Sequence, residues 1–396
     1  MSQPADHRSA VINRIKIFCI LGIFIMHVAL TFTYVPTIYP FWIFDVSSPS
    51  LILTGMSSFL NSVCMPLFFF LAGILAHKYF IDSNARHFIA RGKKWFFYLL
   101  ITWPLVAGSI LLSCHLADIP IHWVDMVFPK NKYNQSWMWL PFNFFHLWFL
   151  VCLMLFEWVA ALIIWVKLRI KLTLGLSVLS VIIIHALAAF STDEGFLLTP
   201  IVFHEKTLFT VLAYLSWYML GLHFSIRTLH ESIGWFFKNA IVFFTVVILY
   251  FVLKYMFFAF HKDLQPLVWV ALVLCDALVV LCVFGFFLRL DEHSSFFTKI
   301  RLFKSPHWHQ WILKNQLGIY ILQIPVIFLL FSVTNKFTIV KNATTAIGRQ
   351  VTYKTENVET WTTYAVFIGL TAGICLVLLV LVRLMKGKSD RSMLES

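Results

Sequence analysis

The stretch IKIFCILGIFIMHVALTFT, residues 15–33, is almost unbroken apolar sequence that contains one cation, Lys16, and one histidine, His27. About twenty such residues cross the ~30 Å hydrocarbon core of a bilayer as a helix, so this stretch predicts a membrane span. His27 follows Lys16 by about 16 Å of helix, and eleven steps of about 100° return to nearly the same face. With Lys16 at the inner edge of the membrane, the imidazole lies near its middle. Ionisable groups at that depth are costly, so His27 is a candidate functional residue. The alternative is a packing histidine whose partner is a serine or a backbone carbonyl.

Composition extends this interpretation to the whole chain. Of the 396 residues, 60% are hydrophobic and 12% are charged, whereas about 25% of an ordinary soluble domain is charged. We therefore expect an all-α polytopic integral membrane protein. The first apolar stretch is too long for a signal peptide and is followed by no small-residue cleavage site, so we expect it to be retained as a helix.

Windows of about twenty apolar residues predict about ten transmembrane helices. They cover residues 12–33, 53–76, 95–114, 145–166, 172–190, 206–226, 236–259, 266–288, 311–333 and 361–383. We see no internal repeat, no low-complexity tract and no separate soluble domain. The sequence therefore predicts one membrane domain over residues 1–390.

The positive charges indicate the orientation of these helices. If the N-terminus is cytoplasmic, 21 of the 31 Lys and Arg residues fall in inner segments, 9 fall in outer loops, and Lys314 lies at an inner helix end. This bias predicts that both termini are cytoplasmic. The net charge of +13 does not indicate a nucleic-acid partner, because the cations lie between apolar runs instead of forming one patch.

Several kinds of site are disfavoured by the motifs. The 7 cysteines lie within or at the ends of apolar segments and form no C-x-x-C pair, which argues against a disulfide framework and a thiolate metal site. No metal is expected. No Walker-type glycine loop, H-E-x-x-H or G-x-S-x-G motif is found, so phosphoryl transfer, zinc proteolysis and an elbow serine lack support.

Two cations mark the inner end of the third predicted helix. Arg91 and Lys94 are three residues apart and share a helix face, so they form a candidate phosphate-binding site. The alternative is ordinary anchoring of a helix by positive charges on the inner side.

Further polar residues mark later helices. His146 and Trp148 open the fourth predicted helix at its outer end, where aromatic residues are also expected of any interface belt. Gln323 lies in the ninth predicted helix after Tyr320 and before Pro325. Its amide needs partners within the bundle, and one structural alternative is that it satisfies a backbone carbonyl freed by the proline.

Together these features resemble the acyltransferase-3 family of integral membrane acyltransferases, most closely the glucan succinyltransferase branch (glucans biosynthesis protein C-like). The family's first-helix signature, Arg, ten residues and His, is matched here by Lys16 and His27. Its basic R-x-x-R pair is matched by Arg91 and Lys94, with Lys in the last position. Lysine keeps the charge but loses the forked geometry of arginine.

Four further segments are similar to family segments, and the resemblance covers nearly the whole chain. They are MPLFFFLAG at residues 65–73, HLWFL at 146–150, YMLG at 218–221 and IYILQIP at 319–325. Related sequences often have histidine where this chain has Gln323.

The resemblance implies an O-acyltransferase in the cell (inner) membrane. It would move a short acyl group, acetyl or succinyl, from cytoplasmic acyl-CoA, a co-substrate and not a cofactor, to a hydroxyl of a cell-envelope glycan, a glycolipid or a related acceptor. Arg91 and Lys94, helped by Lys16, would hold the donor's phosphates. His27 would act as general base, because an imidazole exchanges protons near neutral pH.

Other residues have supporting roles in this hypothesis. His146 and Trp148 orient the acceptor, and Tyr320 and Gln323 support the site. The second hypothesis is a transporter or flippase for a lipid-linked sugar, in which His27 and Gln323 line the path. We find no repeated halves or broken helices of the kind transporters often show. A third is a purely structural membrane partner.

Overall fold

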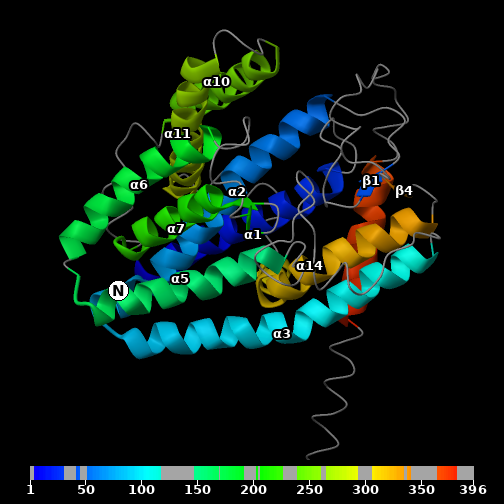
Figure 1. The fold of residues 1–396 in the computed structure, drawn as a ribbon, viewed down its shortest axis with the longest axis horizontal. Helices are drawn as coiled ribbons and strands as arrows, with labels where there is room; N and C mark the ends of the chain where they lie inside the picture. Colours follow the sequence, from blue (N-terminus) through cyan, green and yellow to red (C-terminus); the bar gives the residue numbers. More distant parts are fainter. Residues whose placement is uncertain are drawn as a thin grey trace, which may run out of the picture.

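The computed structural model of the chain is a bundle of α-helices (Figure 1). It describes residues 4–30, 42–44, 51–116, 147–168, 170–190, 202–203, 206–225, 239–259, 265–292, 306–333, 337–339 and 364–380. The helices within these ranges are α1 (Pro4–Leu30), α2 (Leu51–Ile81), α3 (Ala85–Leu116), α5 (Trp148–Trp165), α6 (Ile170–Phe190), α7 (Leu208–Leu222), α10 (Ala240–Ala259), α11 (Gln265–Glu292), α14 (Pro306–Val333) and a last helix, Tyr364–Val380.

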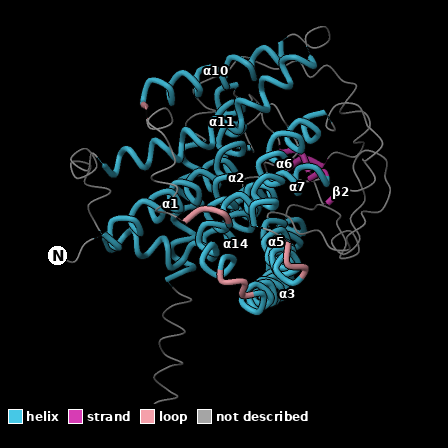
Figure 2. Tube along the Cα trace, turned by 90° about the vertical axis from the view of Figure 1, so that its left-hand side faces the viewer, coloured by secondary structure: helices cyan, strands magenta, loops and turns pink. Residues whose placement is uncertain are grey.

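Each of the predicted spans falls on one of these helices, so the all-α polytopic membrane class is confirmed. Within the described residues, 5 helices are long and apolar enough to cross a membrane. They are α1, α2, α3, α5 and α14, and they pack side by side as α2 on α1, α1 on α14, α14 on α3 and α3 on α5. In both views α10 and α3 lie at opposite edges of the bundle (Figure 1 and Figure 2).

Two glycines allow α2 and α7 to cross at backbone distance. A side chain at Gly73 would overlap the carbonyl oxygen of Tyr218, and one at Gly221 would overlap the carbonyl oxygen of Phe70. Small residues are common where membrane helices approach closely, because association there depends on packing. Gly73, at the end of MPLFFFLAG, therefore packs against α7, and Gly221, at the end of YMLG, packs against α2.

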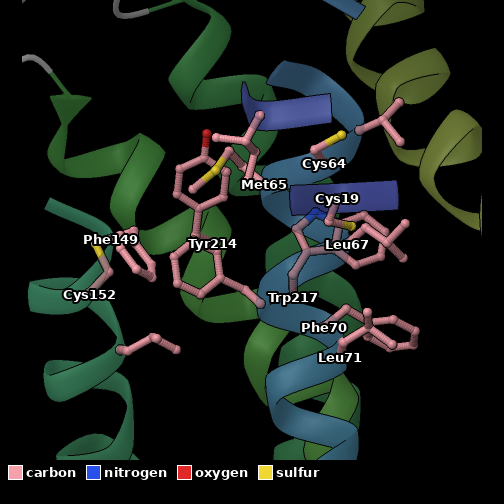
Figure 3. Packing of buried hydrophobic residues seen from close by; sticks show 14 of the residues in the cluster. Cys19, Cys64, Met65, Leu67, Phe70, Leu71, Phe149, Cys152, Tyr214 and Trp217 are labelled. Carbon is pink, nitrogen blue, oxygen red and sulfur yellow. The ribbon is translucent and has the colours of Figure 1, made fainter. Parts of the chain in front are cut away.

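Aromatic rings fill the space between α2, α7 and α5. The ring of Tyr214 stacks on Phe69 of α2 at 5.2 Å and on Trp148 of α5 at 5.5 Å between centroids. Figure 3 shows Tyr214 between Phe149 of α5 and the face of α2 that carries Met65. Edge and offset arrangements of this kind add to the energy of burial.

A tight turn joins α2 to α3 and determines where α3 begins. Ser83 has a positive φ of 52°, and the side-chain oxygen of Asn84 accepts a hydrogen bond from the backbone N–H of His87 at 3.1 Å. This is the geometry of an N-terminal helix cap. Because of it, α3 starts ten residues before the predicted span 95–114, and Arg91 lies inside the helix.

Two short strand pairs accompany the helices, and one of them joins segments that are far apart in the chain. β1 (Trp42–Phe44) pairs antiparallel with β4 (Phe337–Ile339), and β2 (Val202–Phe203) pairs with β3 (Lys206–Thr207). Strands of two or three residues carry no readable periodicity, so the sequence does not predict them.

Candidate functional site

A cavity of about 210 Å³ lies between α1, α2, α3, α5 and α14. Its polar lining comes from Lys16, Arg91, Gln316 and Tyr320. The rest is apolar: Ile20, Ile23, Met65, Phe68, Leu71, Ala72, Leu75, Trp95, Phe149, Leu153 and Leu317. The cavity is therefore an apolar space with its two cations on α1 and α3.

The cavity extends along one face of α1. Lys16, Ile20 and Ile23 line it at intervals of four and three residues, which is the spacing of one helix face. His27 continues this face one turn beyond Ile23. The predicted stripe thus lines the cavity from Lys16 to Ile23, and His27 lies just beyond the lining residues.

Tyr320 lines the cavity and contacts His27, which is not among the lining residues. The Tyr320 ring lies 4.0 Å from Phe149 and 6.2 Å from His27 between centroids, and it meets His27 edge to face. The exposed fraction of His27 is 8%, so its imidazole is enclosed by the bundle. The structure therefore brings together four predicted site residues: Lys16, Arg91 and Tyr320 on the cavity wall, and His27 against the Tyr320 ring.

Arg91 lines the cavity and also forms an ion pair with a buried acid. Its Nη2 atom lies 2.9 Å from Oε1 of Glu157 on α5, whose side chain is fully buried, while 25% of the Arg91 side chain is exposed. Tyr218 of α7 lies beside Glu157. One residue further along each helix, Gly92 lets α3 approach the indole of Trp158. The pair is thus located next to a tight contact between α3 and α5.

Lys94 points elsewhere. Its side chain is exposed, and its Nζ atom lies 5.7 Å from the centroid of the Tyr98 ring, a cation–π arrangement. It is not among the residues that line the cavity. A donor-binding role for Lys94 stays a prediction, whereas Lys16 and Arg91 line one space.

The other predicted residues do not line the cavity, or they lie outside the described residues. Trp148 is buried, and its ring stacks on Tyr214. His146 lies outside the described residues. Gln323 is 1% exposed, and its amide oxygen and nitrogen find no hydrogen-bond partner within the described part of the chain. The amide therefore does not satisfy the carbonyl freed by Pro325.

Two polar residues of the site were not predicted. Glu157 stands alone as an acid in the apolar sequence of α5, a signal that it needs a cation nearby. Gln316 lines the cavity one turn before Tyr320. Its face on α14 was not assigned because the apolar pattern of this helix does not single out one side.

This arrangement combines three chemical properties. Lys16 and Arg91 are cations suited to phosphate oxygens, and arginine in particular presents a planar set of N–H donors. The apolar wall accommodates an uncharged chain. Behind Tyr320, His27 offers a group that accepts and returns protons.

Comparison with known proteins identifies one family. The model of the acyltransferase-3 family, described as an acyltransferase domain, matches residues 10–380. No curated protein and no solved structure matches the chain.

Proposed function

Because this chain belongs to the acyltransferase-3 family and is therefore a membrane acyltransferase, we propose that it transfers a short acyl group, acetyl or succinyl, from cytoplasmic acyl-CoA to a hydroxyl of a cell-envelope glycan or a related acceptor. The observation that carries this proposal is the cavity lined by Lys16, Arg91 and Tyr320, together with the contact between the Tyr320 ring and His27. In this proposal the protein lies in the cell (inner) membrane with both termini in the cytoplasm, as the Lys and Arg bias predicts.

Donor binding uses the cationic end of the cavity. The phosphates of acyl-CoA interact with Lys16 and Arg91, and Lys94 attracts them from outside the cavity. The thioester-bearing arm then extends between the apolar side chains toward Tyr320. This direction is supported by the order of the lining residues along α1.

Acyl transfer takes place beyond Tyr320. The imidazole of His27 accepts the proton of the acceptor hydroxyl while the oxygen attacks the thioester carbonyl. The C–S bond breaks, the acyl group is left on the acceptor oxygen, and the CoA thiolate takes up a proton. His146, Trp148 and Gln323 support the acceptor side in this proposal.

The test uses purified protein in lipid nanodiscs. Equilibrium binding of labelled acetyl-CoA and succinyl-CoA is measured with and without an excess of unlabelled acyl-CoA, and transfer of label to cell-envelope glycan is then followed. We expect saturable binding of at least one donor and transfer of its label. Absence of binding of both donors would overturn the proposed donor site.

A further inference from the structure

The guanidinium of Arg91 faces a buried acid and the cavity at the same time. Its Nη2 atom is 2.9 Å from the carboxylate of Glu157, and the residue also lines the cavity. A guanidinium carries five N–H donors in a planar fork, so one carboxylate oxygen leaves most of them free to bind a second anion.

If Glu157 served only to pack α5 against α3, its burial would cost more free energy than that of an apolar residue. A fully buried carboxylate loses its hydration, and an apolar residue of similar volume at this position is often equally stabilising or more so. The close approach of α3 and α5 is already provided by Gly92 against Trp158. The acid therefore contributes a defined orientation of Arg91 that apolar contact does not provide.

We propose that Glu157 is a positioning residue for the acyl donor, which holds one edge of the Arg91 guanidinium so that its remaining N–H donors face the donor's phosphate. This inference rests on the proposed function, because it takes the cavity as the acyl-CoA site. It adds a residue from α5 to the donor site and assigns Glu157 no contact with the reacting atoms.

The alternative is that the ion pair only holds α3 against α5. In that case, loss of the acid lowers thermal stability without changing donor affinity per folded molecule. A positioning role predicts that loss of the acid lowers donor affinity more than thermal stability. The reason is that a mobile guanidinium loses part of its charge-assisted hydrogen bonding to phosphate.

The first test is E157Q, which keeps the shape of the side chain and removes its charge. We expect the KM and the Kd for acyl-CoA to rise about tenfold, with kcat within about twofold of the wild type. The matched control is W158F on the same helix, which changes the contact with Gly92 and leaves the ion pair intact. We expect it to keep the wild-type donor affinity.

The second test asks whether Glu157 acts through Arg91. The double variant R91A/E157Q should bind acyl-CoA as weakly as R91A alone, because two residues of one unit are not additive. If E157Q does not fold, the variant R91K tests the same proposal. It keeps a cation beside Glu157 but not the fork, and we expect its KM for the donor to rise as well.

The outcomes separate the two proposals. Unchanged acyl-CoA affinity in R91A overturns the donor site and, with it, the role of Glu157. Weakened affinity in R91A together with wild-type affinity in E157Q overturns the role of Glu157 alone. Wild-type affinity in R91K overturns it too, since a fork would then be unnecessary.

Discussion

The imidazole of His27 on α1 and the phenol ring of Tyr320 on α14 meet edge to face, with their centroids 6.2 Å apart. Because Tyr320 lines the cavity and His27 lies behind it, this contact connects the histidine of the first helix to the space that contains Lys16. The two helices also pack directly on each other.

Replacement of His27 by glutamine should abolish proton transfer while it preserves the fold. Glutamine keeps hydrogen-bonding capacity but takes up no proton at neutral pH. We expect acyl transfer to fall by about 10² to 10⁴, the usual contribution of a positioned acid or base. Transfer is measured with labelled acyl-CoA, and expression and insertion are measured alongside. The exposed His115 supplies the control, H115Q, which should remain active. Near wild-type transfer in H27Q would mean that His27 is a packing residue.

Arg91 should contribute to donor affinity, whereas Arg86, on the same helix, should not. R91A is expected to weaken acyl-CoA binding by roughly 1.5–3 kcal/mol, the scale of a charge-assisted hydrogen bond. R86A changes an exposed side chain that is absent from the cavity wall. K94R should be tolerated. Equal losses in R91A and R86A, measured by equilibrium binding, would indicate a general effect of surface charge and not a specific site.

Gly73 should be intolerant of a side chain. A methyl group there meets the backbone of α7, which cannot rotate away as a flexible side chain does. We expect G73A to lower the free energy of unfolding by about 1–3 kcal/mol or to shift the thermal midpoint accordingly. Gly108 of α3 has open space at its Cβ position, so G108A is the matched control and should not be destabilising. Similar midpoints for both variants would contradict the close crossing of α2 and α7.

The orientation of the helices can be tested with an impermeant thiol reagent. Single cysteines replace Ser83, in the exposed turn between α2 and α3, and Asn131, in a predicted outer loop, in a cysteine-free background. Only the cysteine at position 131 should react from outside intact cells, because the Lys and Arg bias places position 83 inside. Reaction at position 83 in intact cells would reverse the predicted topology.

Several features could be predicted from sequence because each depends on local pattern. A run such as residues 15–33 is long and apolar enough to span a bilayer wherever it packs, so the all-α membrane class follows from the chain alone. The common face of Lys16 and His27 is likewise a consequence of helix periodicity. The motif segments ending at Gly73 and Gly221 were found as a family resemblance, without the reason for their glycines.

The partners of these residues were decided by tertiary structure, because contacts between helices depend on how each helix is rotated and where it crosses its neighbours. The sequence spacing predicts that Arg91 and Lys94 share a helix face. In the structure Arg91 faces Glu157 and the cavity, whereas Lys94 lies over the ring of Tyr98. Apolar patterns are nearly uniform around helices that are covered by lipid and protein alike, so they do not specify which face meets which. The sequence by itself therefore determined which residues are membrane helices and which ionisable groups they carry. Only the packing of the helices brought Lys16 of α1 and Arg91 of α3 to one cavity, because that depends on how each helix is rotated against its neighbours.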